Sequence, residues 1–395
     1  MLQHPPFETY KLGENKMEKR IGIYLHIPFC VQKCRYCDFC SFAGASSNRM
    51  EVYVSELCRR IAHERKSLSD VCVDTIYFGG GTPTLLSVEA FSRIFDTLRA
   101  SCKMSDNCEI TCECNPATAD EKKFCALREL GFNRLSIGLQ SVHDEELQML
   151  GRIHTYEDFR KTFSDARAAG FDNISVDLMY ALPDQVLARF EESLVRLAEL
   201  SPEHISVYGL KIEEGTPFWA QRDSLRLPEE ETELAMYLAC TEILSRYGYE
   251  KYEISNFSKK GRESRHNLRY WHGEEYLGFG VAAHSYFEGE RFGNSRDIVA
   301  FLSGEDIVEE RVRLDERDLR NEYLMLRLRL SEGIDERELD ERFGVRFDTL
   351  LPATKRLVEH GLLQRRGERI SFTDRGFFVS NAILSELLEF EEKNC

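Results

Sequence analysis

The sequence predicts an α/β protein in which a partial, TIM-type barrel of six β/α units precedes a smaller C-terminal winged-helix-like domain. Three observations predict this fold. Segments with strand periodicity alternate six times with amphipathic helical segments. One face of the predicted strands is polar in strand after strand. The end of the chain changes to an order of helix, helix and hairpin. A chain of 395 residues has room for two or three domains of about 150 residues each.

The predicted strands are short segments rich in apolar and β-branched residues. They are 21–27, 74–79, 109–114, 134–140, 173–179 and 204–210. The main amphipathic segments between them are 50–66, 87–101, 119–130, 155–169 and 185–200. This alternation indicates parallel strands joined by right-handed crossovers. Six such units favour an open barrel over the complete eight-unit barrel.

The strands alternate between apolar and polar side chains. In 134–140, Leu135, Ile137 and Leu139 share one face and polar residues or glycine share the other. A sheet buried on both faces usually consists of continuous apolar segments instead. We therefore expect helices on the apolar face and a ligand-lined interior on the polar face. An ordinary sheet with one face in water is the alternative.

The chain divides into four predicted parts. Residues 1–19 form a flexible N-terminal extension, with Met17 as an alternative start, and 20–215 form the core barrel. Residues 216–316 are a less regular extension with a helix at 229–247. Residues 317–395 form the winged-helix-like domain. Its predicted elements are helices at 318–330 and 347–360 and a hairpin with its turn in RGER, 366–369.

Charge and cysteine content restrict the function. With 68 acidic and 52 basic residues, the net charge of −16 disfavours binding to phosphate backbones, so we expect no nucleic-acid partner. No apolar segment is long enough to span a membrane, and no secretory signal opens the chain. Thirteen cysteines, an odd number, without an export signal predict reduced thiols in the cytoplasm.

Four cysteines lie close together directly after the first strand. Cys30, Cys34 and Cys37 have the spacing C-x3-C-x2-C, and Cys40 follows. Zinc sites usually combine two separated cysteine pairs, whereas iron–sulfur clusters are bound by closely spaced cysteines. Three thiolates leave one iron of a four-iron cluster open to another ligand. Cys40 would block that position, so we expect it to bind heme or nothing. Cys112 and Cys114 lie on an apolar strand face and are expected in the core.

The cysteine spacing resembles that of the radical S-adenosylmethionine (SAM) superfamily. The likeness extends to the oxygen-independent coproporphyrinogen III oxidase-like branch and covers residues from about 20 to 390. Its motifs are YLHIPFC at 24–30, GGGTP at 79–83, ECNP at 113–116, RLSIGLQS at 134–141, LGRIH at 150–154 and DLMYALPDQ at 177–185. The resemblance implies a [4Fe-4S] cluster that binds SAM and cleaves it reductively to a 5′-deoxyadenosyl radical.

The resemblance also implies the site residues. The cluster ligands are Cys30, Cys34 and Cys37. The SAM-binding residues are Tyr24, Gly80, Gly81, Thr82, Glu113, Gln140, Arg152 and Asp177. Glycines allow close approach of the backbone to a ligand, and an arginine suits a carboxylate through paired hydrogen bonds. No residue is assigned a catalytic role.

Within this branch the sequence resembles the HemW group of heme chaperones more than the dehydrogenases. Only 29 residues precede Cys30, the cysteine loop reads CDFC where dehydrogenases have CGC, and HNLRYW at 266–271 matches a motif that the chaperone group associates with heme. His266 is therefore a candidate heme ligand, with Arg265 and Arg269 as partners for propionates. Alternatively, His266 and Asn267 only hold a loop by hydrogen bonds.

The resemblance therefore implies a cytoplasmic heme chaperone with three cofactors: a [4Fe-4S] cluster, SAM and heme. Its partners would be heme and heme-accepting respiratory enzymes, with the chaperone peripheral at the membrane during delivery and a homodimer as an open alternative. The competing function is an oxygen-independent coproporphyrinogen III dehydrogenase, which decarboxylates porphyrinogen propionates oxidatively. A radical SAM enzyme for another substrate is a third alternative, so enzymatic activity stays open.

Overall fold

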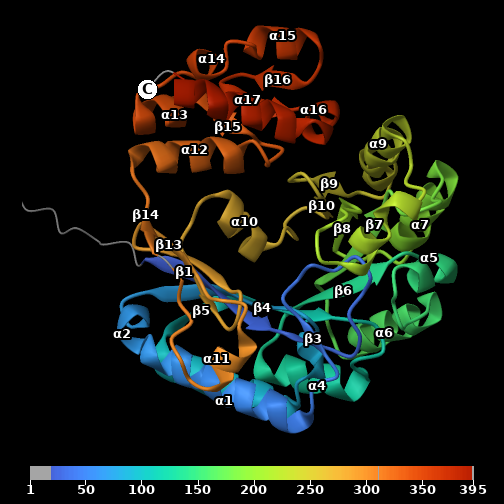
Figure 1. Cartoon of the computed structure of the whole chain (residues 1–395), viewed down its shortest axis with the longest axis vertical. Coiled ribbons are helices and arrows are strands. Elements are labelled where there is room, and N and C mark those ends of the chain that lie inside the picture. The colour runs from blue at the N-terminus through green and yellow to red at the C-terminus, as the bar shows by residue number, and fades with distance from the viewer. Residues whose placement is uncertain (1–18, 310, 394–395) are drawn as a thin grey trace, which may run out of the picture.

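The computed structural model describes residues 19–309 and 311–393, and its centre is an open parallel sheet (Figure 1). The six predicted strands are present and hydrogen-bonded in chain order, each parallel to the next. They are β1(Arg20–Ile27), β4(Cys72–Gly80), β5(Lys103–Cys114), β6(Arg134–Gln140), β7(Ile174–Tyr180) and β8(His204–Gly209). The sheet does not close on itself, so the predicted partial barrel is confirmed. Most of the predicted extension 1–19 falls outside the described residues.

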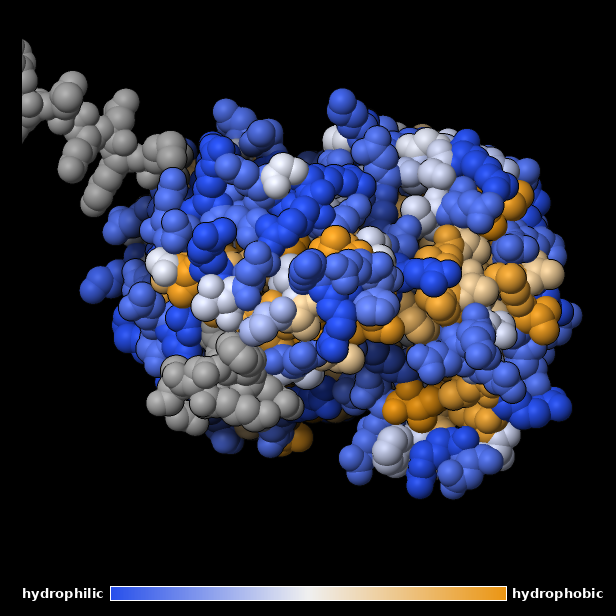
Figure 2. Space-filling model, turned by 90° about the horizontal axis from the view of Figure 1, so that it is seen from above, coloured by the Kyte–Doolittle hydropathy of each residue, from blue (hydrophilic) through white to orange (hydrophobic). Residues whose placement is uncertain are grey.

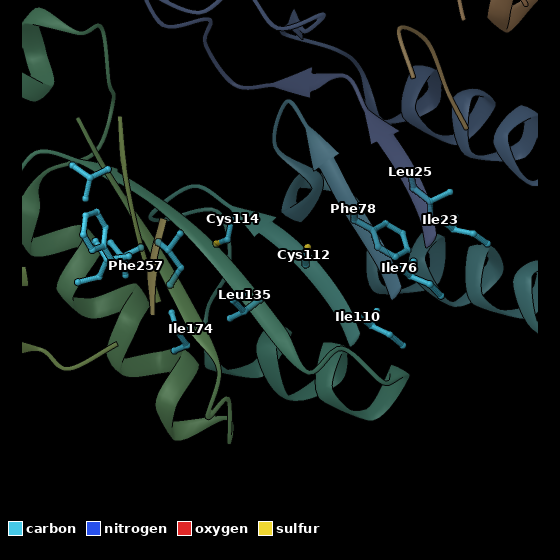
Figure 3. Packing of buried hydrophobic residues seen from close by; sticks show 14 of the residues in the cluster. Ile23, Leu25, Ile76, Phe78, Ile110, Cys112, Cys114, Leu135, Ile174 and Phe257 are labelled. Carbon is cyan, nitrogen blue, oxygen red and sulfur yellow. The ribbon is translucent and has the colours of Figure 1, made fainter. Parts of the chain in front are cut away.

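Helices cover the outer, apolar face of these strands (Figure 1). The main ones are α1(Ser47–His63), α3(Val88–Ser101), α4(Glu121–Leu130), α6(Tyr156–Ala168) and α7(Leu187–Glu199). Shorter elements between them are β2(Phe29–Cys30), β3(Phe42–Ala43), α2(Arg65–Leu68), η1(Pro83–Leu85) and α5(Asp144–Met149). Alternate strand residues such as Ile76, Phe78 and Leu135 pack beneath the helices (Figure 3). Cys112 and Cys114 belong to this core, as predicted.

The segment after β8 extends the sheet at both edges. It contains α8(Pro217–Ala220), η2(Arg222–Ser224), α9(Glu230–Arg246), β9(Glu250–Lys251), β10(Asn256–Ser258), α10(Arg265–Trp271), β11(Tyr276–Phe279), β12(His284–Phe287), β13(Glu290–Gly293), α11(Ile298–Leu302) and β14(Val312–Arg313). β11 runs parallel to β1, and β10 runs antiparallel to β8. Within the described residues the sheet therefore has twelve strands, and its added edges are largely antiparallel. These edge strands were not predicted from the sequence.

The end of the chain forms the predicted small helical unit with a hairpin. Its elements are α12(Glu316–Arg327), β15(Ile334–Asp335), α13(Glu336–Phe343), α14(Phe347–Leu350), α15(Thr354–Glu359), β16(Leu363–Arg366), β17(Arg369–Phe372), α16(Asp374–Phe378) and α17(Ser380–Lys393). The prediction of one helix over 347–360 was wrong. The helix breaks at Leu351, whose φ of −126° is not helical, because Pro352 restricts the preceding residue and has no N–H to donate.

The small C-terminal unit is held to the barrel by a buried cation. The ammonium group of Lys251 lies 2.7 Å from a carboxylate oxygen of Asp374 in α16 and contacts the rings of Tyr237, Phe257 and Phe377. Seen from above, the surface is mainly hydrophilic, with apolar patches gathered beside a hollow (Figure 2). Within residues 19–309 and 311–393, no helix combines the length and apolarity that crossing a bilayer requires.

Candidate functional site

A cavity of about 570 Å³ lies at the carboxyl ends of the barrel strands, where parallel β/α barrels place their active sites. The polar strand faces converge on it, as the alternation in sequence predicted. Its walls include the three clustered cysteines together with Gly80, Gly81, Glu113, Ser136, Gly138, Gln140, Arg152 and Asp177. Residues far apart in the sequence thus meet in one space.

The cysteine loop presents Cys30, Cys34 and Cys37 to this cavity, and none of the three thiols is in a disulfide. The hydroxyl of Thr82 lies 3.7 Å from the sulfur of Cys30. The buried Cys40 is separate: its thiol faces the carbonyl oxygen of Arg296 at 3.9 Å, and it does not line the cavity. The structure therefore groups the predicted ligands and leaves Cys40 out.

The donor set fits a four-iron cluster better than a single metal ion. Within the described part of the chain, no three His, Cys, Asp or Glu side chains converge as they would on one ion. A cluster is larger, and each thiolate binds a different iron, so its ligands lie around a cavity rather than around a point. Cys30, Cys34 and Cys37 line the same cavity without converging on one point.

Gly80 and Gly81 bring the backbone at the carboxyl end of β4 into the site. Gly80 has a φ of +111°, and a Cβ there would lie 2.5 Å from the ring of His26. A Cβ on Gly81 would lie 2.6 Å from the carbonyl oxygen of Phe29. Both positions therefore require glycine. This close packing directs the N–H of Gly80 to a carboxylate oxygen of Glu113 at 3.0 Å.

Two half-buried carboxylates, Glu113 and Asp177, occupy the cavity wall. Glu113 accepts a second hydrogen bond from the hydroxyl of Tyr77 at 2.9 Å, and Asp177 accepts one from Ser136 at 3.3 Å. Burial raises the pKa of Glu113 to about 7 and also raises the pKa of Asp177, because both are removed from water. A ligand with a cationic amine or with hydroxyl groups would compensate these carboxylates for the loss of contact with water.

Arg152 provides the opposite charge. Its guanidinium donates hydrogen bonds to the Cys34 sulfur at 3.5 Å and, at 2.6 Å each, to Asn115 Oδ1 and the Gly138 carbonyl oxygen. Gln140 ends its strand with a φ of +75° and accepts a hydrogen bond from Tyr208 at 2.7 Å. The cavity is thus lined by carboxylates and by a guanidinium group.

Two predicted SAM residues do not line the cavity. Thr82 lies behind Cys30 and is hydrogen-bonded to Asn115 at 2.7 Å. Tyr24 lies deeper in the barrel, where its hydroxyl is hydrogen-bonded to Nδ1 of His26 at 2.9 Å. Several lining residues were not among the predicted site residues, and they include Tyr36, Met179, Tyr208 and Lys211. Strand periodicity predicts Met179 and Tyr208, whereas Tyr36 and Lys211 lie in loops without a period.

His266 lies at the opposite end of the barrel. Its Nδ1 is hydrogen-bonded to the Thr75 hydroxyl at 2.9 Å and its Nε2 to the Tyr270 hydroxyl at 2.8 Å. Burial lowers its pKa to about 3, which keeps the ring neutral. Arg269, predicted to pair with a propionate, pairs instead with Asp74 inside the protein. Both ring nitrogens are thus engaged, and a heme-ligand role for His266 stays a prediction.

Comparison with known proteins identifies the family. Residues 24–197 match the Radical SAM superfamily, and residues 314–379 match the HemN C-terminal domain. The heme chaperone HemW of Bacillus subtilis (strain 168) is 35% identical over 378 residues, which cover 92% of this chain and 98% of that protein. The heme chaperone HemW of Escherichia coli (strain K12) is 33% identical over 373 residues, covering 93% and 98%.

A solved structure shows the same fold. The coproporphyrinogen III oxidase HemN from Escherichia coli, described as a radical SAM enzyme, superposes with a TM-score of 0.83 at 24% identity, covering 94% of this chain and 90% of that one. The whole architecture, barrel and C-terminal unit together, is therefore shared. The chain belongs to the radical SAM superfamily and, within it, to the family of HemW heme chaperones.

Proposed function

We propose that this protein is a cytoplasmic heme chaperone that carries a [4Fe-4S] cluster, binds SAM and heme, and delivers heme to respiratory enzymes at the membrane. One observation carries the cofactor part: three cysteines, two carboxylates and an arginine meet in one cavity at the carboxyl ends of the strands. The heme part is supported by the names of the relatives. They are called heme chaperones, and this chain matches them over almost their whole length.

The cavity residues divide into three roles. Cys30, Cys34 and Cys37 would hold the cluster, which when bound supplies the electron for reductive cleavage of SAM. Glu113 would pair with the ammonium group of SAM beside the backbone of Gly80. The remaining charges complete the fit: the guanidinium of Arg152 suits the carboxylate of SAM, and the carboxylate of Asp177 suits hydroxyl groups of a ribose.

The test compares chaperone and dehydrogenase on the same preparation. The full chain is reconstituted anaerobically, and its cluster is verified by iron content and absorbance. It is then assayed for carbon dioxide release from coproporphyrinogen III with SAM and a reductant, and separately titrated with heme. We expect stoichiometric heme binding and no decarboxylation. Decarboxylation with an intact cluster would establish the dehydrogenase instead.

A second preparation controls for the cluster. A variant with Cys30, Cys34 and Cys37 all changed to serine cannot hold it, so any porphyrinogen turnover that persists is not radical chemistry. Heme binding by this variant shows whether heme needs the cluster. Absence of heme binding by the wild-type chain would overturn the chaperone proposal.

A further inference from the structure

A short helix lies at the end of the barrel opposite the cavity. It is α10, formed by the segment RHNLRYW. Its first two N–H groups, those of Arg265 and His266, donate to the two carboxylate oxygens of Glu109 at 3.3 and 3.1 Å. Glu109 lies in β5 on the same strand face as Glu113, four residues earlier. The helix is thus fixed to the strand that carries the proposed SAM carboxylate.

The same helix is tied to two further strands. The buried guanidinium of Arg269 pairs with Asp74 of β4 and donates to the carbonyl oxygen of Arg20 in β1 at 3.3 Å. A Cβ on Gly22 of β1 would lie only 2.7 Å from this side chain, so the arginine passes directly over the strand. All of these contacts are made at the end of the barrel opposite the cavity, which is called the foot of the barrel below.

A chain of contacts leads from the helix to the cavity. The His266 ring, held by its two hydrogen bonds, stacks on the ring of Tyr77 with centroids 5.2 Å apart and planes inclined by 25°. The Tyr77 hydroxyl donates to one oxygen of Glu113 at 2.9 Å, and the N–H of Gly80 donates to the other at 3.0 Å. A carboxylate held through both oxygens has one defined position.

We propose that α10 supports the SAM site: His266 positions the ring of Tyr77, and Tyr77 fixes the Glu113 carboxylate where it meets the ammonium group of the ligand. This inference rests on the proposed SAM site. It gives the HNLRYW segment a role in the binding of SAM rather than in the ligation of heme. His266 and Tyr77 are positioning residues, since neither lines the cavity.

Ligation of heme iron by His266 would be costly in this arrangement. One ring nitrogen would have to leave Thr75 or Tyr270, and the ring would have to leave Tyr77. A hydroxyl left buried without a hydrogen-bond partner destabilises the fold. The packing therefore favours a fixed, neutral ring.

Glu113 faces charged or titratable groups from several elements. They are Tyr24 of β1, Tyr77 of β4, Arg134 of β6, Asp177 of β7 and Tyr270 of α10. Burial and Asp177 raise the pKa of Glu113, whereas Arg134 and the hydrogen bonds from Tyr77 and Gly80 lower it. Removal of the Tyr77 hydroxyl therefore raises this pKa further. Because the ionised carboxylate binds an ammonium group, SAM affinity should fall as the pH falls through the pKa of Glu113.

The experiment measures the dissociation constant of SAM across the pH range around neutrality, using the full reconstituted chain. Tyr77→Phe keeps the ring and removes the hydroxyl, and we expect SAM affinity to fall about tenfold with its pH midpoint shifted upward. His266→Ala should likewise lower SAM affinity and shift its pH midpoint upward, while heme affinity is retained. Glu113→Gln, which does not titrate, gives the pH dependence of SAM itself. His360→Ala, on an exposed histidine of the C-terminal unit, is the matched control.

Each outcome is decisive. Normal SAM affinity and an unshifted midpoint in both Tyr77→Phe and His266→Ala would overturn the inference. So would loss of heme with retention of SAM in His266→Ala, which would make His266 the heme ligand. Failure of the wild-type chain to bind SAM would overturn the proposed SAM site and the inference together. Tyr77→Phe preserves the packing of the ring, so it remains informative if His266→Ala does not fold.

Discussion

A guanidinium nitrogen of Arg152 lies 3.5 Å from the sulfur of Cys34, although 118 residues separate the two in the sequence. The arginine is held in place by the side chain of Asn115 and the carbonyl oxygen of Gly138. A fixed positive charge therefore lies against one proposed cluster ligand. Hydrogen bonds to sulfur are among the factors that set the reduction potential of an iron–sulfur cluster.

Replacing Arg152 with glutamine should make the cluster harder to reduce. Loss of the positive charge and of the hydrogen bond to sulfur destabilises the added electron, so we expect a more negative midpoint potential in a redox titration followed by electron paramagnetic resonance. Arg160→Gln, on an exposed arginine of α6 that pairs with Glu157, is the control. Equal potentials in all three proteins would show that Arg152 does not influence the cluster.

Serine substitutions should separate the three cavity cysteines from Cys40. Cys30→Ser, Cys34→Ser and Cys37→Ser should each lower iron content and the cluster absorbance after anaerobic reconstitution, because each removes a thiolate ligand. Cys40→Ser should retain the cluster, since its side chain is 8% exposed and directed away from the cavity. Loss of iron in Cys40→Ser alone would reverse the assignment.

Alanine at Gly80 should destabilise the fold more than alanine at Gly170. Both glycines have positive φ, +111° and +87°, so both variants have the backbone strain of about 1–3 kcal/mol. Only at Gly80 does the new Cβ meet other atoms within 4 Å, namely the His26 ring. Urea unfolding should therefore show a larger loss for Gly80→Ala, together with weaker SAM binding. Similar losses in the two variants would mean that the ring moves aside freely.

Glu253 should make the protein less stable as the pH rises. It is 1% exposed, and burial raises its pKa to about 7 in the folded chain. The folded state then holds this proton more tightly than the unfolded state, whose value is 4.5, so stability falls between those two values. Glu253→Gln removes this loss, and its stability relative to wild type should increase by about 2 kcal/mol from about pH 5.5 to about pH 8.

The matching measurement is denaturant unfolding at both pH values. Glu250→Gln, on an exposed carboxylate of the neighbouring strand β9, controls for the general effect of removing one charge. The same pH dependence in wild type and Glu253→Gln would show that this carboxyl does not titrate differently on folding.

Sequence periodicity was sufficient to predict the barrel and the polar strand faces in its interior. Glu113, Gln140 and Asp177 lie on these faces because a strand with one helix-covered face alternates between apolar and polar residues. Their role in binding SAM was implied only by the resemblance to the radical SAM superfamily, and it stays a prediction. The spacing of Cys34 and its partners predicted that these thiols lie close together. The boundaries between the four predicted parts stay predictions.

What could not be predicted depends on contacts between distant segments. The edge strand β11 is short and pairs with β1 from the other end of the chain, so no local pattern predicts it. Arg269 and its partner Asp74 are 195 residues apart, and only their pairing shows that this arginine is not free for a propionate. The break before Pro352 was visible in the sequence, because proline disfavours a helical conformation in the residue before it.

The helix at the foot of the barrel lies outside the cavity but is joined to the cavity wall. The ring of its His266 stacks on Tyr77, and the hydroxyl of Tyr77 donates a hydrogen bond to Glu113, which lines the cavity. A change in α10 is therefore transmitted to the cavity through one aromatic ring and one carboxylate, so residues that never touch a ligand belong among those that shape this cavity.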